Sequence, residues 1–120
     1  MAFVTDLAVF LVALLHLYFL VLEMFLWTRR TGRKVFGLTP EFAEATRALA
    51  ANQGLYNGFL ATGLLWGVFL GEGAVSIKVF FLGCVITAGL FGGATVSRKI
   101  FLVQALPGAI AMALVLATAP

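Results

Sequence analysis

The side chains that could do chemistry lie in two stretches of this sequence. One is Leu22-Glu23-Met24, preceded by His16, and the other is "NQGLYN" at residues 52–57, which holds two asparagines, a glutamine and a tyrosine. Both adjoin long apolar runs, where an unpaired carboxamide is costly and a carboxyl group indicates function by default. A Glu, a His, a Tyr and several amides could accept and deliver protons, or could hold a polar head group among apolar walls.

Several kinds of site are excluded by the residues that the sequence lacks. A single His16 and a single Cys84 cannot build a zinc site within one chain, and a haem held by two histidines would need a dimer. No phosphate-binding glycine loop, nucleophile elbow or serine–base arrangement occurs. We therefore expect no metal and no cofactor. The net charge of +3 does not indicate nucleic-acid binding, because every basic residue adjoins an apolar run.

The composition is that of a membrane protein. Of the 120 residues, 62% are hydrophobic and 11% are charged, whereas a soluble domain has about a quarter of its residues charged. At about 20 residues per crossing, this length accommodates four helices with short connections. We predict an all-α membrane protein whose partner is the lipid bilayer. The single transmembrane domain, residues 1–120, would be a four-transmembrane-helix bundle with helices at about 4–28, 40–71, 75–97 and 99–118.

The second predicted helix has clear start and stop signals. Thr39 can cap the helix, Pro40 suits the first helical position, and Glu41 favours the positive end of the helix dipole. Gly71-Glu72-Gly73 marks the point where the helix leaves the bilayer.

The distribution of basic residues predicts the orientation. Lysines and arginines near helix ends concentrate on the cytoplasmic side of a membrane. Only Lys78 lies on one side of the predicted bundle, and seven basic residues lie on the other: Arg29, Arg30, Arg33, Lys34, Arg47, Arg98 and Lys99. We therefore predict a multi-pass protein of the cell membrane with both termini on the non-cytoplasmic side.

Each predicted helix carries one stripe of small or polar residues, and we expect the stripes to face one another. The stripes are His16, Glu23 and Trp27; Asn52, Tyr56, Gly63 and Gly67, with Gln53 and Asn57 beside them; Cys84, Ala88 and Thr95; and Gln104, Gly108 and Ala111. The glycines predict close helix packing. Tyr18 points away from the first stripe, toward lipid or a neighbouring chain.

Depth along the helices predicts a polar cavity in the cytoplasmic half of the bundle. His16 would form its floor, about 10 Å from Glu23 along the helix axis. We expect Glu23 to accept a hydrogen bond from Asn52, Gln53 or Gln104. The predicted ligand-binding residues are His16, Glu23, Asn52, Gln53, Tyr56, Asn57, Thr95 and Gln104.

Three functions are consistent with this set. The first is binding or transport of a small, partly lipophilic molecule, and a transporter with such thin walls would need a homo-oligomer. The second is an intramembrane acid–base enzyme, of the isomerase or cyclase type, that uses Glu23 with His16 or Tyr56 as catalytic residues. The third is a structural bundle in which amides only join helices, at about 0.6 kcal/mol per hydrogen bond. Glu23 favours a functional site, because Gln would serve equally well as a structural link.

The chain also resembles a known family. The stretches that carry the resemblance are His16-x-Tyr18, Leu22-Glu23-Met24, Trp27-Thr28, Val35-Phe36-Gly37, residues 52–60 (NQGLYNGFL), Ala88-Gly89, Gly92-Gly93-Ala94-Thr95 and Gln104. Over nearly the whole chain this pattern is similar to that of the domain-of-unknown-function family 1304. The resemblance implies a small four-helix integral membrane protein and implies no particular activity.

Overall fold

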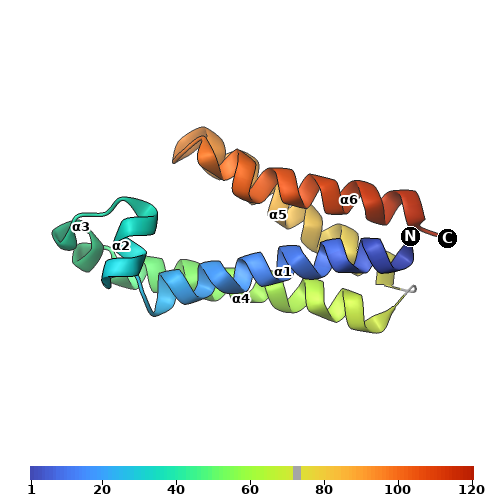
Figure 1. Ribbon diagram of the computed structural model, residues 1–120, viewed down its shortest axis with the longest axis horizontal. Coiled ribbons are helices and arrows are strands. Elements are labelled where there is room, and N and C mark those ends of the chain that lie inside the picture. The colour runs from blue at the N-terminus through green and yellow to red at the C-terminus, as the bar shows by residue number, and fades with distance from the viewer. Residues whose placement is uncertain (72–73) are drawn as a thin grey trace. The chain divides into compact units, whose positions relative to one another are not determined.

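The computed structural model describes residues 1–71 and 74–120, and every regular element in them is a helix (Figure 1). This confirms the predicted all-α class for the described residues. The predicted exit at Glu72-Gly73 lies outside them. In chain order the elements are α1 (Ala2–Met24), α2 (Arg30–Phe36), α3 (Pro40–Ala45), α4 (Arg47–Leu70), α5 (Val75–Thr95), the π-helical turn η2 (Phe101–Ala105) and α6 (Leu106–Thr118).

The chain forms two compact units. Residues 1–13 and 62–120 make up one, here called the terminal unit, and residues 14–61 make up the other, here called the central unit. The terminal unit contains the start of α1, the end of α4, and all of α5, η2 and α6. The central unit contains the end of α1, the start of α4, and the short helices α2 and α3.

Three helices of the described residues are long and apolar enough to cross a membrane: α1, α5 and the continuous helix Phe101–Thr118. Helix α4 is not among them, because its first half carries three carboxamides that lower its mean hydropathy. Length and composition thus support membrane character, and the fourth crossing stays a prediction.

The basic segment after α1, predicted to be a connection between two long helices, contains a helix of its own. Helix α1 ends at Met24, and Arg30–Phe36 form the additional short helix α2. This helix ends at Gly37, whose φ of 66° lies in the left-handed region that glycine adopts without steric cost. The connection between the first two long helices is therefore folded.

The helix predicted at 40–71 is interrupted near its start. Thr39 caps α3 as predicted, because its hydroxyl oxygen accepts a hydrogen bond from Phe42 N at 3.1 Å, and Pro40 follows it. At Thr46 the backbone leaves helical geometry, with φ −107° and ψ 9°, and α4 begins at the next residue. The Thr46 hydroxyl donates to Phe42 O at 2.7 Å and accepts from Trp27 Nε1 at 3.0 Å. These two bonds hold the break in place.

Glycines bring the helices of the terminal unit close together. A side chain at Gly63 would collide with the ring of Phe81, and a Cβ at Gly67 would lie 2.8 Å from Lys78 Cγ. Where α5 crosses η2, a Cβ at Gly89 would lie 2.5 Å from the backbone nitrogen of Ala105. The prediction that Gly63 and Gly67 lie at close helix contacts is confirmed, since only a missing side chain allows such an approach.

The inward face of α5 is not the predicted one. Ala88 and Thr95, from the predicted stripe, are exposed. In a membrane, the space between helices is no more apolar than the lipid. The polarity of a helix face therefore does not decide whether that face is buried, and the face that lets two backbones approach closely is the one that packs inward. The residues of α5 that are buried are Lys78, Leu82, Val85, Gly89 and Gly93.

The last helix begins with a wider turn, η2, and this turn has a local cause. Pro107 has no backbone N–H, and its ring would clash with the carbonyl four residues earlier in an ordinary α-helix. The chain instead forms the π-helical turn, in which Leu106 N donates to Phe101 O. Gln104 lies within this turn and is half-buried.

Candidate functional site

Glu23 and Asn57 meet across two helices of the central unit. Asn57 Nδ2 on α4 donates a hydrogen bond to Glu23 Oε1 on α1 at 2.5 Å. Gly54, one turn before Asn57, makes the approach possible, because a Cβ there would lie 3.1 Å from Glu23 Cβ and 3.2 Å from Leu20 O. Asn57 is buried and Glu23 is half-buried.

The amide that reaches Glu23 differs from the predicted donors. The prediction named Asn52, Gln53 and Gln104, whereas Asn57 makes the bond. The buried positions of the first turns of α4 recur every three or four residues, at Ala50, Gly54, Asn57 and Ala61. Asn52 and Gln53 lie outside this spacing and are exposed, which is why neither lies beside α1.

His16 and Tyr56 have different environments within the central unit. The His16 side chain is fully buried, and its ring meets the edge of Phe19 with centroids 5.4 Å apart. Tyr56 is 52% exposed, and its ring packs against Phe59 at 5.7 Å. His16 is thus buried between helices, whereas Tyr56 lies on the outer face of α4, and a cavity with His16 as its floor stays a prediction.

Thr95 and Gln104 belong to the terminal unit. Thr95 is exposed, and its hydroxyl donates to Phe91 O of the same helix at 2.7 Å. Gln104 lies in η2. The convergence of all eight predicted residues on one cavity therefore stays a prediction, and the bond between Glu23 and Asn57 is the part of it that is observed.

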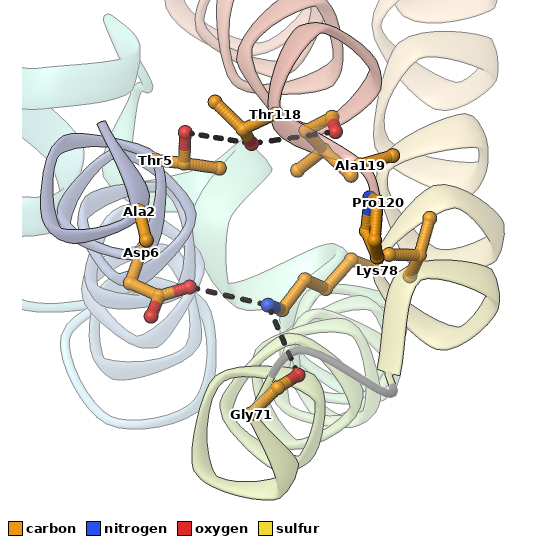
Figure 2. A pocket seen from close by; sticks show the side chains of 10 residues that line it. Ala2, Thr5, Asp6, Gly71, Lys78, Thr118, Ala119 and Pro120 are labelled. Carbon is orange, nitrogen blue, oxygen red and sulfur yellow. Dashed lines mark hydrogen bonds and ion pairs between the residues drawn. The ribbon is translucent and has the colours of Figure 1, made fainter.

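A second polar cluster, which the sequence analysis missed, lies in the terminal unit (Figure 2). Lys78 of α5 is 5% exposed, and its Nζ donates to Asp6 Oδ1 of α1 at 3.1 Å and to Gly71 O at 3.5 Å. These residues line a cavity of about 140 Å³, together with Thr5, Thr118 and apolar side chains. We call it the Asp6–Lys78 cavity.

The two threonines of this cavity join the first and last helices. Their hydroxyl oxygens are 3.2 Å apart, and Thr118 also donates to Leu114 O at 2.8 Å. The sequence did contain a signal for the cluster, since Asp6 and Lys78 both fall within predicted spans, where charges indicate function.

Metal binding has no support in the described part of the chain. Within residues 1–71 and 74–120, no group of three His, Cys, Asp or Glu side chains could hold a metal ion. The side chains of Glu23 and Asn57 themselves can form hydrogen bonds, and the carboxyl group can transfer a proton.

Comparison with known proteins places this arrangement in a family. The family model described as "Protein of unknown function (DUF1304)" matches residues 10–116. The chain belongs to the DUF1304 family. "Uncharacterized protein YpaA" of Lactococcus lactis subsp. lactis is 33% identical over 106 residues, which cover 87% of this chain and 89% of the relative. No solved structure matches.

Membership of DUF1304 confirms the resemblance predicted from the sequence. The matched residues include Glu23, Asn57 and Lys78, whereas Asp6 and Thr118 lie just outside them. In this DUF1304 protein, the two polar clusters thus occupy different units. One contains the half-buried Glu23, which accepts a hydrogen bond from α4, and the other contains the buried Lys78, which donates a hydrogen bond to Asp6 of α1.

Proposed function

We propose that this protein is an integral membrane protein that binds a small, partly lipophilic molecule beside Glu23. The observation that carries the proposal is the hydrogen bond from Asn57 to Glu23, between two helices in the central unit. Asn57 occupies one carboxyl oxygen and leaves the other for a ligand. A carboxyl group in a membrane span is costly, and a purely structural link would be made as well by an amide.

The ligand's polar group would bind to the free side of Glu23. Gln53 lies one turn from Asn57 on α4, and its exposed amide could bind a part of the ligand that extends beyond the contact between α1 and α4. The buried His16 would take part through the ligand or through a water molecule. Apolar side chains of α1 and α4 would cover the rest of the molecule, and this is why we propose a partly lipophilic ligand.

We further propose that α4 is the fourth membrane crossing. Thr5, near the start of α1, and Thr118, at the end of α6, are in hydrogen-bonding contact. This contact supports placing both ends of the chain on the same side of the membrane. Helices α1, α5 and α6 alone would make three crossings and put these ends on opposite sides. An even number requires α4.

The ligand proposal is tested with the full-length protein and its Glu23→Gln variant, purified from membranes in mild detergent. Native mass spectrometry would reveal a co-purifying small molecule on the wild-type protein. The variant keeps the shape of the side chain and removes the carboxyl group. We expect at least about tenfold weaker binding, seen as a lower occupancy, since hydrogen bonds to charged groups contribute about 1.5–3 kcal/mol.

Glu44→Gln is the matched control. Glu44 is an exposed residue of α3 that pairs with Arg47 at 3.7 Å, so its replacement should leave occupancy unchanged. Equal occupancy of the wild-type protein and the Glu23→Gln variant would show that Glu23 only joins helices.

A further inference from the structure

We infer that the Asp6–Lys78 cavity is a second binding site, and that it takes a small zwitterionic group with a primary ammonium and an oxyanion. The site lies entirely in the terminal unit and does not depend on the ligand proposed at Glu23. Three helices contribute to it, through the start of α1, the start of α5 and the end of α6, and Gly71, which directly follows α4, also lines it (Figure 2).

The hydrogen-bonding capacity of the cavity is only partly used. An ammonium group has three donors, and the two bonds of Lys78 Nζ, to Asp6 Oδ1 and Gly71 O, leave one donor for a ligand. Asp6 keeps a second carboxylate oxygen, and its side chain is 39% exposed. The cavity therefore offers a cationic donor and an anionic acceptor side by side.

The threonines add further acceptors. The Thr118 hydroxyl donates to Leu114 O, which leaves its oxygen to accept a bond from Thr5. With both hydroxyl protons engaged, the remaining lone pairs of these oxygens can only accept hydrogen bonds. A ligand that supplies several N–H donors and one oxyanion matches this set.

Charge and size limit the class of ligand. Among the described residues that line the cavity, the charges of Asp6 and Lys78 cancel. A ligand with a net charge would leave an uncompensated charge beside Lys78, which is only 5% exposed, and such a charge is costly. The volume of about 140 Å³ resembles that of a cavity that holds one benzene molecule, about 150 Å³. The site thus fits a group of a few heavy atoms.

Two sources could supply such a group: a free small zwitterion, or the head group of an aminophospholipid. A quaternary ammonium has no N–H and could not donate to Asp6. Phosphatidylethanolamine should therefore bind, and phosphatidylcholine should not. The same difference separates phosphoethanolamine from phosphocholine among free molecules.

The experiment uses the full-length protein in nanodiscs of either lipid, followed by extraction and native mass spectrometry of retained lipid. Thermal unfolding in detergent, with phosphoethanolamine or phosphocholine added, tests the free zwitterions. Retained phosphatidylethanolamine supports the lipid source. A rise in unfolding temperature with phosphoethanolamine alone supports the free one.

The deciding variant is Asp6→Asn, which keeps an acceptor for Lys78 and is expected to fold. It removes the anionic partner of the ligand's ammonium, so we expect at least about a tenfold loss of binding. Lys78→Met should have the same effect, and Lys99→Met, at an exposed lysine, should have none. If Lys78→Met does not fold, Asp6→Asn decides.

Two results would overturn the inference. One is equal retention or equal stabilisation by the primary and quaternary ammonium compounds in the wild-type protein. The other is undiminished binding by folded Asp6→Asn. Either would identify the pair as a structural ion bridge between α1 and α5.

Discussion

At the residue scale, the bond between Asn57 and Glu23 shows how an amide becomes tolerable in an apolar helix. Asn57 is buried because it follows Gly54 by three residues, on the side of α4 that α1 can approach. Asn52 and Gln53, although nearly adjacent in sequence, are exposed. Position on the helix therefore decides which of several similar amides meets the carboxyl group.

Exchanging the carboxyl group and the amide between positions 23 and 57 tests this hydrogen bond. Asn57→Asp alone would place two carboxyl groups in contact, and we expect a loss of about 1–3 kcal/mol of stability. Adding Glu23→Gln restores one amide donor and one carboxyl acceptor, so the double variant should recover most of that loss. Thermal unfolding of the purified proteins measures both. Independent, additive losses would show that the two side chains do not interact.

At the scale of elements, two devices shape the helices. Trp27 fixes the folded basic segment, because its indole N–H bonds Thr46 and its ring packs on Phe36 with centroids 5.0 Å apart. Glycines determine the contacts of α5. At Gly89 the facing atoms belong to the backbone of η2, whereas at Gly63 they belong to a side chain that can move.

These contacts predict an order of sensitivity to an added methyl group. Gly89→Ala should destabilise the protein most, by about 1–3 kcal/mol, because overpacking against backbone cannot be relieved by a side-chain rotation. Gly63→Ala should cost less, since Phe81 can shift. Gly83→Ala should be neutral or slightly stabilising, because a Cβ there meets nothing within 4 Å. Unfolding temperatures in detergent would rank the variants, and equal tolerance at Gly89 and Gly83 would contradict the packing described.

At the scale of the whole molecule, the contact between Thr5 and Thr118 constrains the topology. It joins the beginning of α1 to the end of α6, both of which belong to the terminal unit, and Figure 1 shows the N and C labels beside each other. Combined with the excess of basic residues in the connections, this predicts that both ends lie outside the cytoplasm.

Cysteine labelling of the full-length protein in intact cells tests the topology. In a Cys84→Ala background, a membrane-impermeant thiol reagent should label Ala2→Cys and should not label Thr31→Cys. A reporter fused after Pro120 should show that this end of the chain lies on the same side of the membrane as Ala2. Opposite sides for the two termini would mean that α4 does not cross the membrane.

Composition and local signals by themselves determined much of this protein. Apolar runs of sufficient length predicted helices, Thr39 and Pro40 predicted a helix start, and Leu22-Glu23-Met24 with NQGLYNGFL indicated the DUF1304 family. Each of those features depends on residues that are close together in the chain, so the local sequence is enough to predict it.

Only the tertiary structure decided which faces pack and which polar groups meet. In a bilayer, lipid and protein interior are equally apolar, so hydrophobicity does not mark the inward side of a helix, and the closest backbone approach does. That approach, at Gly54 and Gly89, selected Asn57 as the partner of Glu23 and turned Ala88 and Thr95 outward. The pairing of Asp6 with Lys78 likewise joins residues far apart in sequence. Nothing near either residue in the chain specifies its partner, because the packing of α1 and α5 brings the two together.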